Sequence, residues 1–108
     1  MAKFMIAHLQ QGRGILRPET ARTMHTSALT LLPPLNRMEL GFFETNLNGR
    51  QIIGHLGDLQ AFHTALHLFM NENTGIYLSV NSSGRAGAAG AIRSALLLDF
   101  ANRYFPGP

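Results

Sequence analysis

The sequence predicts an α+β fold, an antiparallel meander sheet with N-terminal helices and a long C-terminal helix packed on one face of it. Three observations support this fold. Apolar residues recur at helical spacing near both ends of the chain, they alternate with polar residues in the middle, and an Asn-Gly pair separates two alternating segments. The 108 residues are the size of one domain, so residues 1–108 are expected to form a single unit.

Two helices are expected before the sheet. Residues 2–11 predict the first, because apolar side chains recur there three and four positions apart and Gly12 follows as a stop. The second helix is expected to begin at Pro18, since the first helical position needs no N–H donor. The pair Pro33-Pro34 then predicts an extended passage toward the sheet.

The middle of the chain predicts a four-strand meander. Asn48-Gly49 is typical of a tight hairpin turn, because both residues tolerate positive φ. The expected strands are residues 38–46, 50–55, 61–70 and 76–80, and the last helix is expected over residues 85–104. The side chains assigned to the core are Phe62, Leu66, Leu68, Ile76, Leu78, Ile92, Leu96 and Phe100.

The composition excludes several functional classes. Charged residues are only 14% of the chain, against about 25% in an average domain, so part of the surface is expected to face other protein. The 9 lysines and arginines are spread along the chain instead of clustered, which is unlike a nucleic-acid-binding surface. The absence of cysteine excludes disulfides, a thiolate nucleophile and cysteine metal ligands, but it does not decide the compartment.

His63 and His67 are the most tempting pair of metal ligands, because their spacing of four would align them on a helix. The surrounding residues instead alternate as in a strand, where four positions span about 13 Å. Two ligands that far apart cannot share one zinc ion with bonds of about 2 Å. We therefore expect no metal and no other cofactor, and we place both histidines on the less buried face of a strand.

The segment Gly54-His55-Leu56-Gly57-Asp58 is the strongest candidate for a functional site. It is expected at the end of a hairpin strand, where a ligand can approach a histidine between glycines without obstruction by a neighbouring Cβ. Taken alone, an ordinary turn into the next strand explains the segment at least as well.

The segment belongs to an ordered series of short motifs that runs over residues 2–105. The series consists of Ala2-Lys3-Phe4-Met5, Ile15-Leu16-Arg17-Pro18-Glu19-Thr20, Leu40-Gly41-Phe42-Phe43, Asn48-Gly49, Gly54-His55-Leu56-Gly57-Asp58, Phe62 and Gly75-Ile76-Tyr77-Leu78-Ser79-Val80-Asn81-Ser82. In this order the motifs resemble the C-terminal part of the serine β-lactamase and penicillin-binding-protein-like superfamily, above all its class C β-lactamase and esterase branch. The resemblance implies a partial β-lactamase-like fold.

Three motifs form the active site in that superfamily: S-x-x-K with the nucleophile, Y-x-N or S-x-N, and K-T-G or H-x-G on a strand. By resemblance, His55-Leu56-Gly57 matches the third motif. The resemblance implies that His55 presents a polar group to the substrate and to the proton-transfer network, and that Gly57 keeps the strand open. It also implies that the backbone N–H of Asp58 is one of two oxyanion donors.

The sequence departs from the superfamily pattern at the other two motifs. Lys3 is the only lysine and no serine precedes it by three positions, so S-x-x-K is absent. Ser79-Val80-Asn81 matches S-x-N but follows His55, whereas the second motif of the family precedes the third. We therefore expect the C-terminal fragment of a hydrolase, with no catalytic residue of its own and no turnover of esters or β-lactams by itself.

The resemblance also implies partners and a location. The full-length parent enzyme would hydrolyse an ester, an amide or a β-lactam through an acyl-enzyme, in the periplasm or cell envelope. The expected partners are such a small-molecule substrate, the remainder of the parent chain and, through an exposed sheet edge, a second copy in a homodimer. The alternative is a non-catalytic protein-interaction module built on the same sheet and helix, and no nucleic-acid partner is expected.

Overall fold

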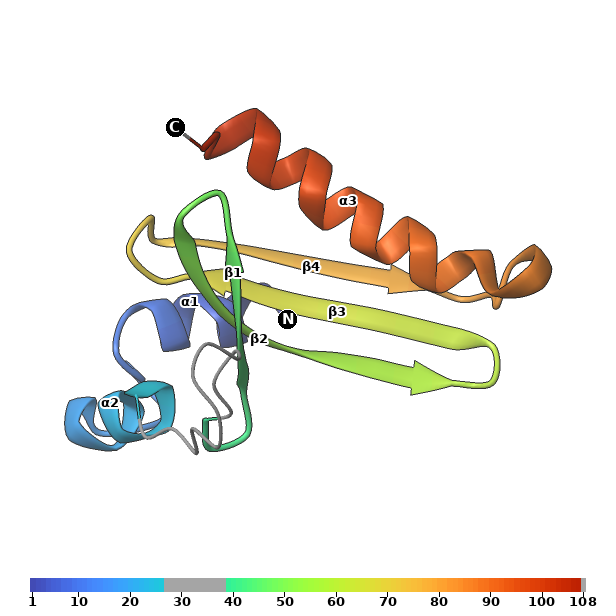
Figure 1. Ribbon diagram of the computed structural model, residues 1–108. Helices are drawn as coiled ribbons and strands as arrows, with labels where there is room; N and C mark the ends of the chain where they lie inside the picture. Colours follow the sequence, from blue (N-terminus) through green and yellow to red (C-terminus); the bar gives the residue numbers. More distant parts are fainter. Residues whose placement is uncertain (27–38, 108) are drawn as a thin grey trace.

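The computed structural model describes residues 1–26 and 39–107, and these residues contain four strands and three α-helices (Figure 1). In chain order the elements are α1 (Ala2–Leu9), α2 (Pro18–Thr26), β1 (Phe43–Leu47), β2 (Arg50–Leu59), β3 (Phe62–Phe69), β4 (Thr74–Val80), a short 3₁₀ turn (Arg85–Gly87) and α3 (Ala88–Tyr104). The predicted α+β class is therefore confirmed. None of the described helices is long and apolar enough to cross a membrane.

The four strands form one antiparallel sheet in the order β1-β2-β3-β4, which confirms the meander. The predicted tight turn joins β1 to β2, with Asn48 and Gly49 at φ values of 55° and 71°. Asparagine and glycine accept this left-handed conformation with the least strain. The extended passage predicted at Pro33-Pro34 lies outside the described residues.

β2 is longer than the sequence predicts, and the described β1 is shorter. β2 extends to Leu59, so the candidate site lies in the second half of a strand instead of at its end. β1 pairs with β2 only as far as Phe43 opposite Gly54. Among the described residues, the outer edge of β2 from His55 to Leu59 therefore has no strand partner, while its inner edge pairs with β3.

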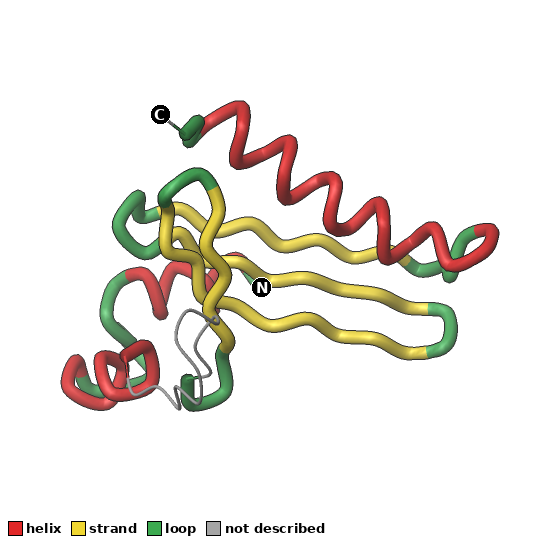
Figure 2. The backbone as a smooth tube through the Cα atoms, in the orientation of Figure 1, coloured by secondary structure: helices red, strands yellow, loops and turns green. Residues whose placement is uncertain are grey.

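Helices cover both faces of the sheet, so the expectation that all of them share one face is wrong (Figure 2). Ile52 and Ile53 are adjacent in β2 and both are fully buried, although adjacent strand residues point to opposite faces. Ile53 belongs to an apolar cluster with side chains of α1 and α2, whereas Ile52 belongs to a cluster with side chains of α3. The sheet is thus the middle layer of the molecule.

The face of α3 that meets the sheet also differs from the predicted one. Ala89 and Ala101 are buried there, whereas Ile92 and Leu96, which the helical periodicity assigns to the core, are 49% and 43% exposed. The observed stripe is shifted by one residue, which is about 100° around the helix. Alanine is small enough to let α3 lie close to the sheet, so packing distance and not hydrophobicity alone selects this face.

Along β3, burial increases with the distance from the β2–β3 turn. Leu66 and Leu68 are buried as predicted, and Ile76 and Leu78 are partly buried. Phe62 was assigned to the core but is 43% exposed, because it is the first residue of β3, where the sheet extends beyond its apolar clusters. The candidate site lies in this same, less covered end of the sheet.

Candidate functional site

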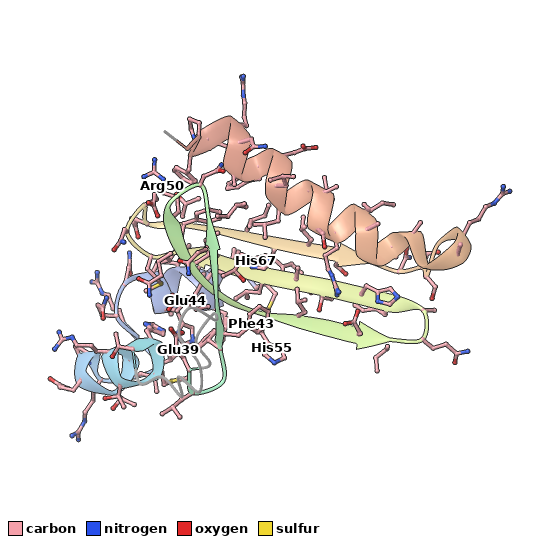
Figure 3. The ribbon with its side chains drawn as sticks, in the orientation of Figure 1. Glu39, Phe43, Glu44, Arg50, His55 and His67 are labelled. Carbon is pink, nitrogen blue, oxygen red and sulfur yellow. The ribbon has the colours of Figure 1, made fainter. Side chains whose placement is uncertain are left out.

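The side chain of His55 is exposed on β2 and lines an open groove of about 350 Å³. Leu56 and Gly57 line the same groove, and its other walls are mainly apolar and include Phe42. Figure 3 shows His55 close to Phe43, and the two ring centroids are 6.0 Å apart. The imidazole is therefore accessible, and it shares the groove with two further residues of the predicted H-x-G segment.

Two glycines flank His55 where β3 comes close to β2. A Cβ on Gly54 would overlap the carbonyl oxygen of Leu66, and a Cβ on Gly57 would overlap the hydroxyl of Thr64. A backbone carbonyl cannot move aside without disturbing the pairing of the two strands, whereas a threonine side chain can rotate. Gly54 is therefore required by the sheet itself, while Gly57 keeps space open in the groove, which Thr64 also lines.

Asp58 lies in a charged cluster between the sheet and α3. Its Oδ1 accepts hydrogen bonds from His63 Nδ1 at 2.6 Å and from Arg93 Nη1 at 2.9 Å. The bond from His63, followed by the bond from Arg93, lowers the pKa of the Asp58 carboxyl below its ordinary value. The carboxylate is thus ionised at neutral pH and paired with a cation.

The four predicted site residues do not all reach the groove with their side chains. Strand residues three apart point to opposite faces, so the side chain of Asp58 lies on the α3 face and that of His55 on the α1–α2 face. Asp58 is not among the described residues that line the groove, and its carboxylate is bonded to Arg93 on the opposite face. The role that the family resemblance implies for Asp58, which is that of a backbone donor, stays a prediction.

His67 is buried beneath α3 with an exposure of 4%, so the prediction that both β3 histidines lie on the less buried face is wrong. Burial, and after it the charge of Arg93, lowers the pKa of His67 to about 4, which leaves the ring uncharged at neutral pH. His63 is instead bonded to Asp58. The described residues contain no group of three or more histidines and carboxylates that could hold a metal ion.

A pair of buried histidines lies beside the groove, and the sequence-based prediction does not contain it. His8 Nδ1 and His25 Nε2 are 2.9 Å apart and join α1 to α2. Both rings contact Phe42, which lines the groove, and burial lowers the pKa of both histidines. The available signal was spacing, because His8 follows Phe4 by four positions and His25 follows Ala21 by four, which places each on an apolar helix face.

We compared the sequence with models of protein families and with curated proteins, and neither comparison found a match. The resemblance to the β-lactamase-like superfamily therefore stays a prediction from the motifs. The function has to be argued from the groove at His55, the free edge of β2 and the charged cluster at Asp58.

Proposed function

We propose that this chain is the C-terminal part of a serine hydrolase of the β-lactamase and penicillin-binding-protein-like superfamily, with His55-Leu56-Gly57 as its H-x-G motif. The observation that carries the proposal is the exposed His55 in an open groove, on the half of β2 whose outer edge has no strand partner among the described residues. A histidine sealed under packed aliphatic side chains at this position would be incompatible with such a site.

The proposed reaction is acyl transfer to a serine, followed by hydrolysis of the acyl-enzyme by water. The serine and its lysine, as S-x-x-K, belong to a segment outside these 108 residues. The described residues form one side of the site. His55 hydrogen-bonds the substrate or takes part in proton transfer, and the backbone N–H of Asp58 donates to the oxyanion of the tetrahedral intermediate.

The free edge of β2 suits the oxyanion role. Such a donor has to be a fixed N–H that is not already bonded to a neighbouring strand. Pairing with β1 ends at Gly54, so the N–H groups on the outer edge from His55 onward are open within the described part of the chain. Pairing with β3 along the inner edge keeps the same segment in place.

The lining of the groove favours an uncharged substrate. None of the described residues that line it is a lysine, an arginine or a carboxylate, and Phe4, Phe42 and Tyr77 make it largely apolar. The nearby charge of Asp58 is paired with Arg93. We expect an ester with an apolar acyl or alcohol group to be preferred over an anionic β-lactam.

The test is the full-length parent enzyme, found by extending the reading frame toward its amino-terminal side. We expect an S-x-x-K motif there, and turnover of chromogenic esters that a serine-directed inhibitor blocks. His55→Ala should lower kcat/KM by about 100-fold, because it removes a proton-transfer group. Arg85→Ala is the control, since this exposed side chain does not line the groove, and it should leave kcat/KM unchanged.

Two results would overturn the proposal. One is an extended reading frame without S-x-x-K, and the other is an unchanged kcat/KM in the His55→Ala enzyme. The 108-residue chain by itself should show neither ester turnover nor labelling by a fluorophosphonate, because it has no S-x-x-K. Inhibitor-sensitive turnover by this chain would mean that the nucleophile has been misassigned.

A second candidate is a non-catalytic interaction module, and the outer edge of β4 favours it. β4 is the last strand in the sheet order, so this edge has no strand partner among the described residues. Exposed strand edges pair readily with other strands, and a second copy of the chain offers one, which gives the expected homodimer. Sedimentation at micromolar concentration tests this candidate: a dimer supports it, and a clean monomer argues against it.

A further inference from the structure

We propose that Arg93 is a positioning residue for the H-x-G segment, a role that rests on the function proposed above. Arg93 lies on α3, and its side chain is only 12% exposed. Its Nη1 donates hydrogen bonds to the carbonyl oxygens of Gly57 at 3.2 Å and Thr64 at 3.0 Å, and to Asp58 Oδ1 at 2.9 Å. One guanidinium thus contacts β2 and β3 where Gly57 is opposite Thr64.

The contact with Gly57 fixes the direction of the proposed oxyanion donor. The carbonyl of Gly57 and the N–H of Asp58 belong to one planar trans peptide group, so the two bonds point in opposite directions. Because the same nitrogen of Arg93 also reaches the Thr64 carbonyl on β3, the Gly57 carbonyl points toward β3. The N–H of Asp58 therefore points to the outer edge of β2, where the described chain provides no strand partner.

The same contact strengthens the donor. A hydrogen bond to the carbonyl of a peptide group polarises the group and makes its N–H a better donor. A charged guanidinium forms a stronger bond of this kind than a neutral donor does. Arg93 therefore both aligns the N–H of Asp58 and increases its capacity to stabilise a developing negative charge.

Asp58 is held through its side chain as well. Its carboxylate accepts hydrogen bonds from Arg93 and from His63 on the opposite strand. Beyond it, the hydroxyl of Ser83 donates to the carbonyl of Gln60 in the β2–β3 turn. These three groups restrain the end of the hairpin, and among the three only Arg93 bonds the backbone of the H-x-G segment.

A positioning role predicts a specific kinetic effect. Arg93 itself does not line the groove; it bonds the backbone of two lining residues, Gly57 and Thr64, and its removal leaves the side chain of His55 and the apolar walls in place. Its removal frees the Asp58 N–H, which bonds fully to the substrate oxygen only when that oxygen becomes an anion in the transition state. The loss of Arg93 should therefore lower kcat and leave KM nearly constant.

The first experiment measures amide hydrogen exchange in the 108-residue chain. Arg93→Met should speed exchange at residues 57–64 by about 10-fold or more and leave residues 50–54 unchanged, because only the end of the hairpin loses its contacts with α3. Arg103→Met, an exposed arginine on the same helix, is the matched control. Unchanged exchange at 57–64, or an equal increase over the whole sheet, would overturn the proposal.

The second experiment measures ester hydrolysis by the full-length enzyme. Arg93→Met should lower kcat by about 10- to 100-fold with KM within about twofold of wild type, and Arg93→Lys should recover part of the loss because it restores the charge. A raised KM at constant kcat would contradict a positioning role. A wild-type enzyme without hydrolase activity would refute the proposed function, and the exchange data would still show whether Arg93 fixes the segment.

Discussion

The two halves of β2 belong to one strand but have opposite environments. Residues 50–54 pair with β1 on one edge, residues 52–54 also pair with β3 on the other, and Ile52 and Ile53 are fully buried between the two helical layers. Residues 55–59 pair only with β3 among the described residues, and their side chains are exposed or half-buried. The structural and the candidate functional parts of the strand are therefore adjacent.

The contrast shows how the outer edge of β2 can lack a strand partner among the described residues and still be held in a fixed position. The paired half fixes the direction of the strand, and the continuous chain carries that direction into the open half. Gly54 lies at the boundary, where an added Cβ would overlap the carbonyl oxygen of Leu66 on β3. Changes in the first half should therefore affect stability, and changes in the second half should affect activity.

The largest effect is expected at the boundary between the halves. Gly54→Ala should lower the free energy of unfolding by about 3 kcal/mol or more, because the new Cβ would overlap the carbonyl of Leu66 and push β3 away. Urea denaturation measures the change. Gly90→Ala is the matched control: this glycine lies inside α3 with free space around it, so alanine should stabilise the protein by about 0.5–1 kcal/mol. Equal effects at the two positions would show that the close approach at Gly54 is wrong.

A pH dependence of similar size is expected from His67, which lies opposite Gly54 in the paired half. Its pKa is about 4 in the folded chain and near 6.5 when unfolded, so the unfolded state binds more protons between these values. Stability is therefore full above about pH 6.5 and falls as the pH drops toward 4, by about 3 kcal/mol in all.

His67→Leu should remove most of this dependence. Urea denaturation at pH 7.5 and at pH 5 compares the two proteins, and the wild type should lose more stability between them than the variant. Some dependence should persist, because the pKa values of His8 and His25 are lowered in the same direction. An unchanged pH profile in the variant would mean that His67 is not buried under α3.

The smallest effect on stability is expected in the open half. His55→Ala should change the free energy of unfolding by no more than about 0.5 kcal/mol, because the side chain is exposed and no hydrogen bond holds it among the described residues. Thermal unfolding of this variant beside Gly54→Ala tests the contrast directly. A loss of more than about 2 kcal/mol at His55 would show that the open half is structural too.

Local signals in the sequence predicted most of the fold. The Asn48-Gly49 turn, the start of α2 at Pro18 and the alternation of the strands each depend on a few neighbouring residues, and each is present in the structure. The arrangement of the helices on the two faces of the sheet could not be predicted from such local signals. The burial of both Ile52 and Ile53 requires cover on both faces, and a pair of adjacent apolar residues does not reveal which helix covers which face.

The candidate site, like the fold, has one part that local sequence predicts and another part that it does not. The accessibility of His55 between two glycines follows from local sequence and is present in the structure, although its catalytic meaning stays a prediction. The partners of Asp58 were not predictable, because Arg93 lies 35 positions away and approaches only when α3 packs on the sheet. An isolated arginine on a helix has no local feature that distinguishes it from a solvated one.

α3 is bonded to the sheet near both of its ends, through Arg93 to Asp58 and through Asn102 Oδ1 to Asn48 Nδ2 in the β1–β2 turn. Each residue added to a helix turns everything after it by about 100° and advances it by about 1.5 Å. A single insertion between these two positions would preserve one contact and lose the other. The distance between the β1–β2 turn and the β2–β3 end of the sheet therefore sets the number of α3 residues between Arg93 and Asn102. Insertions and deletions in related chains should occur in the turns instead.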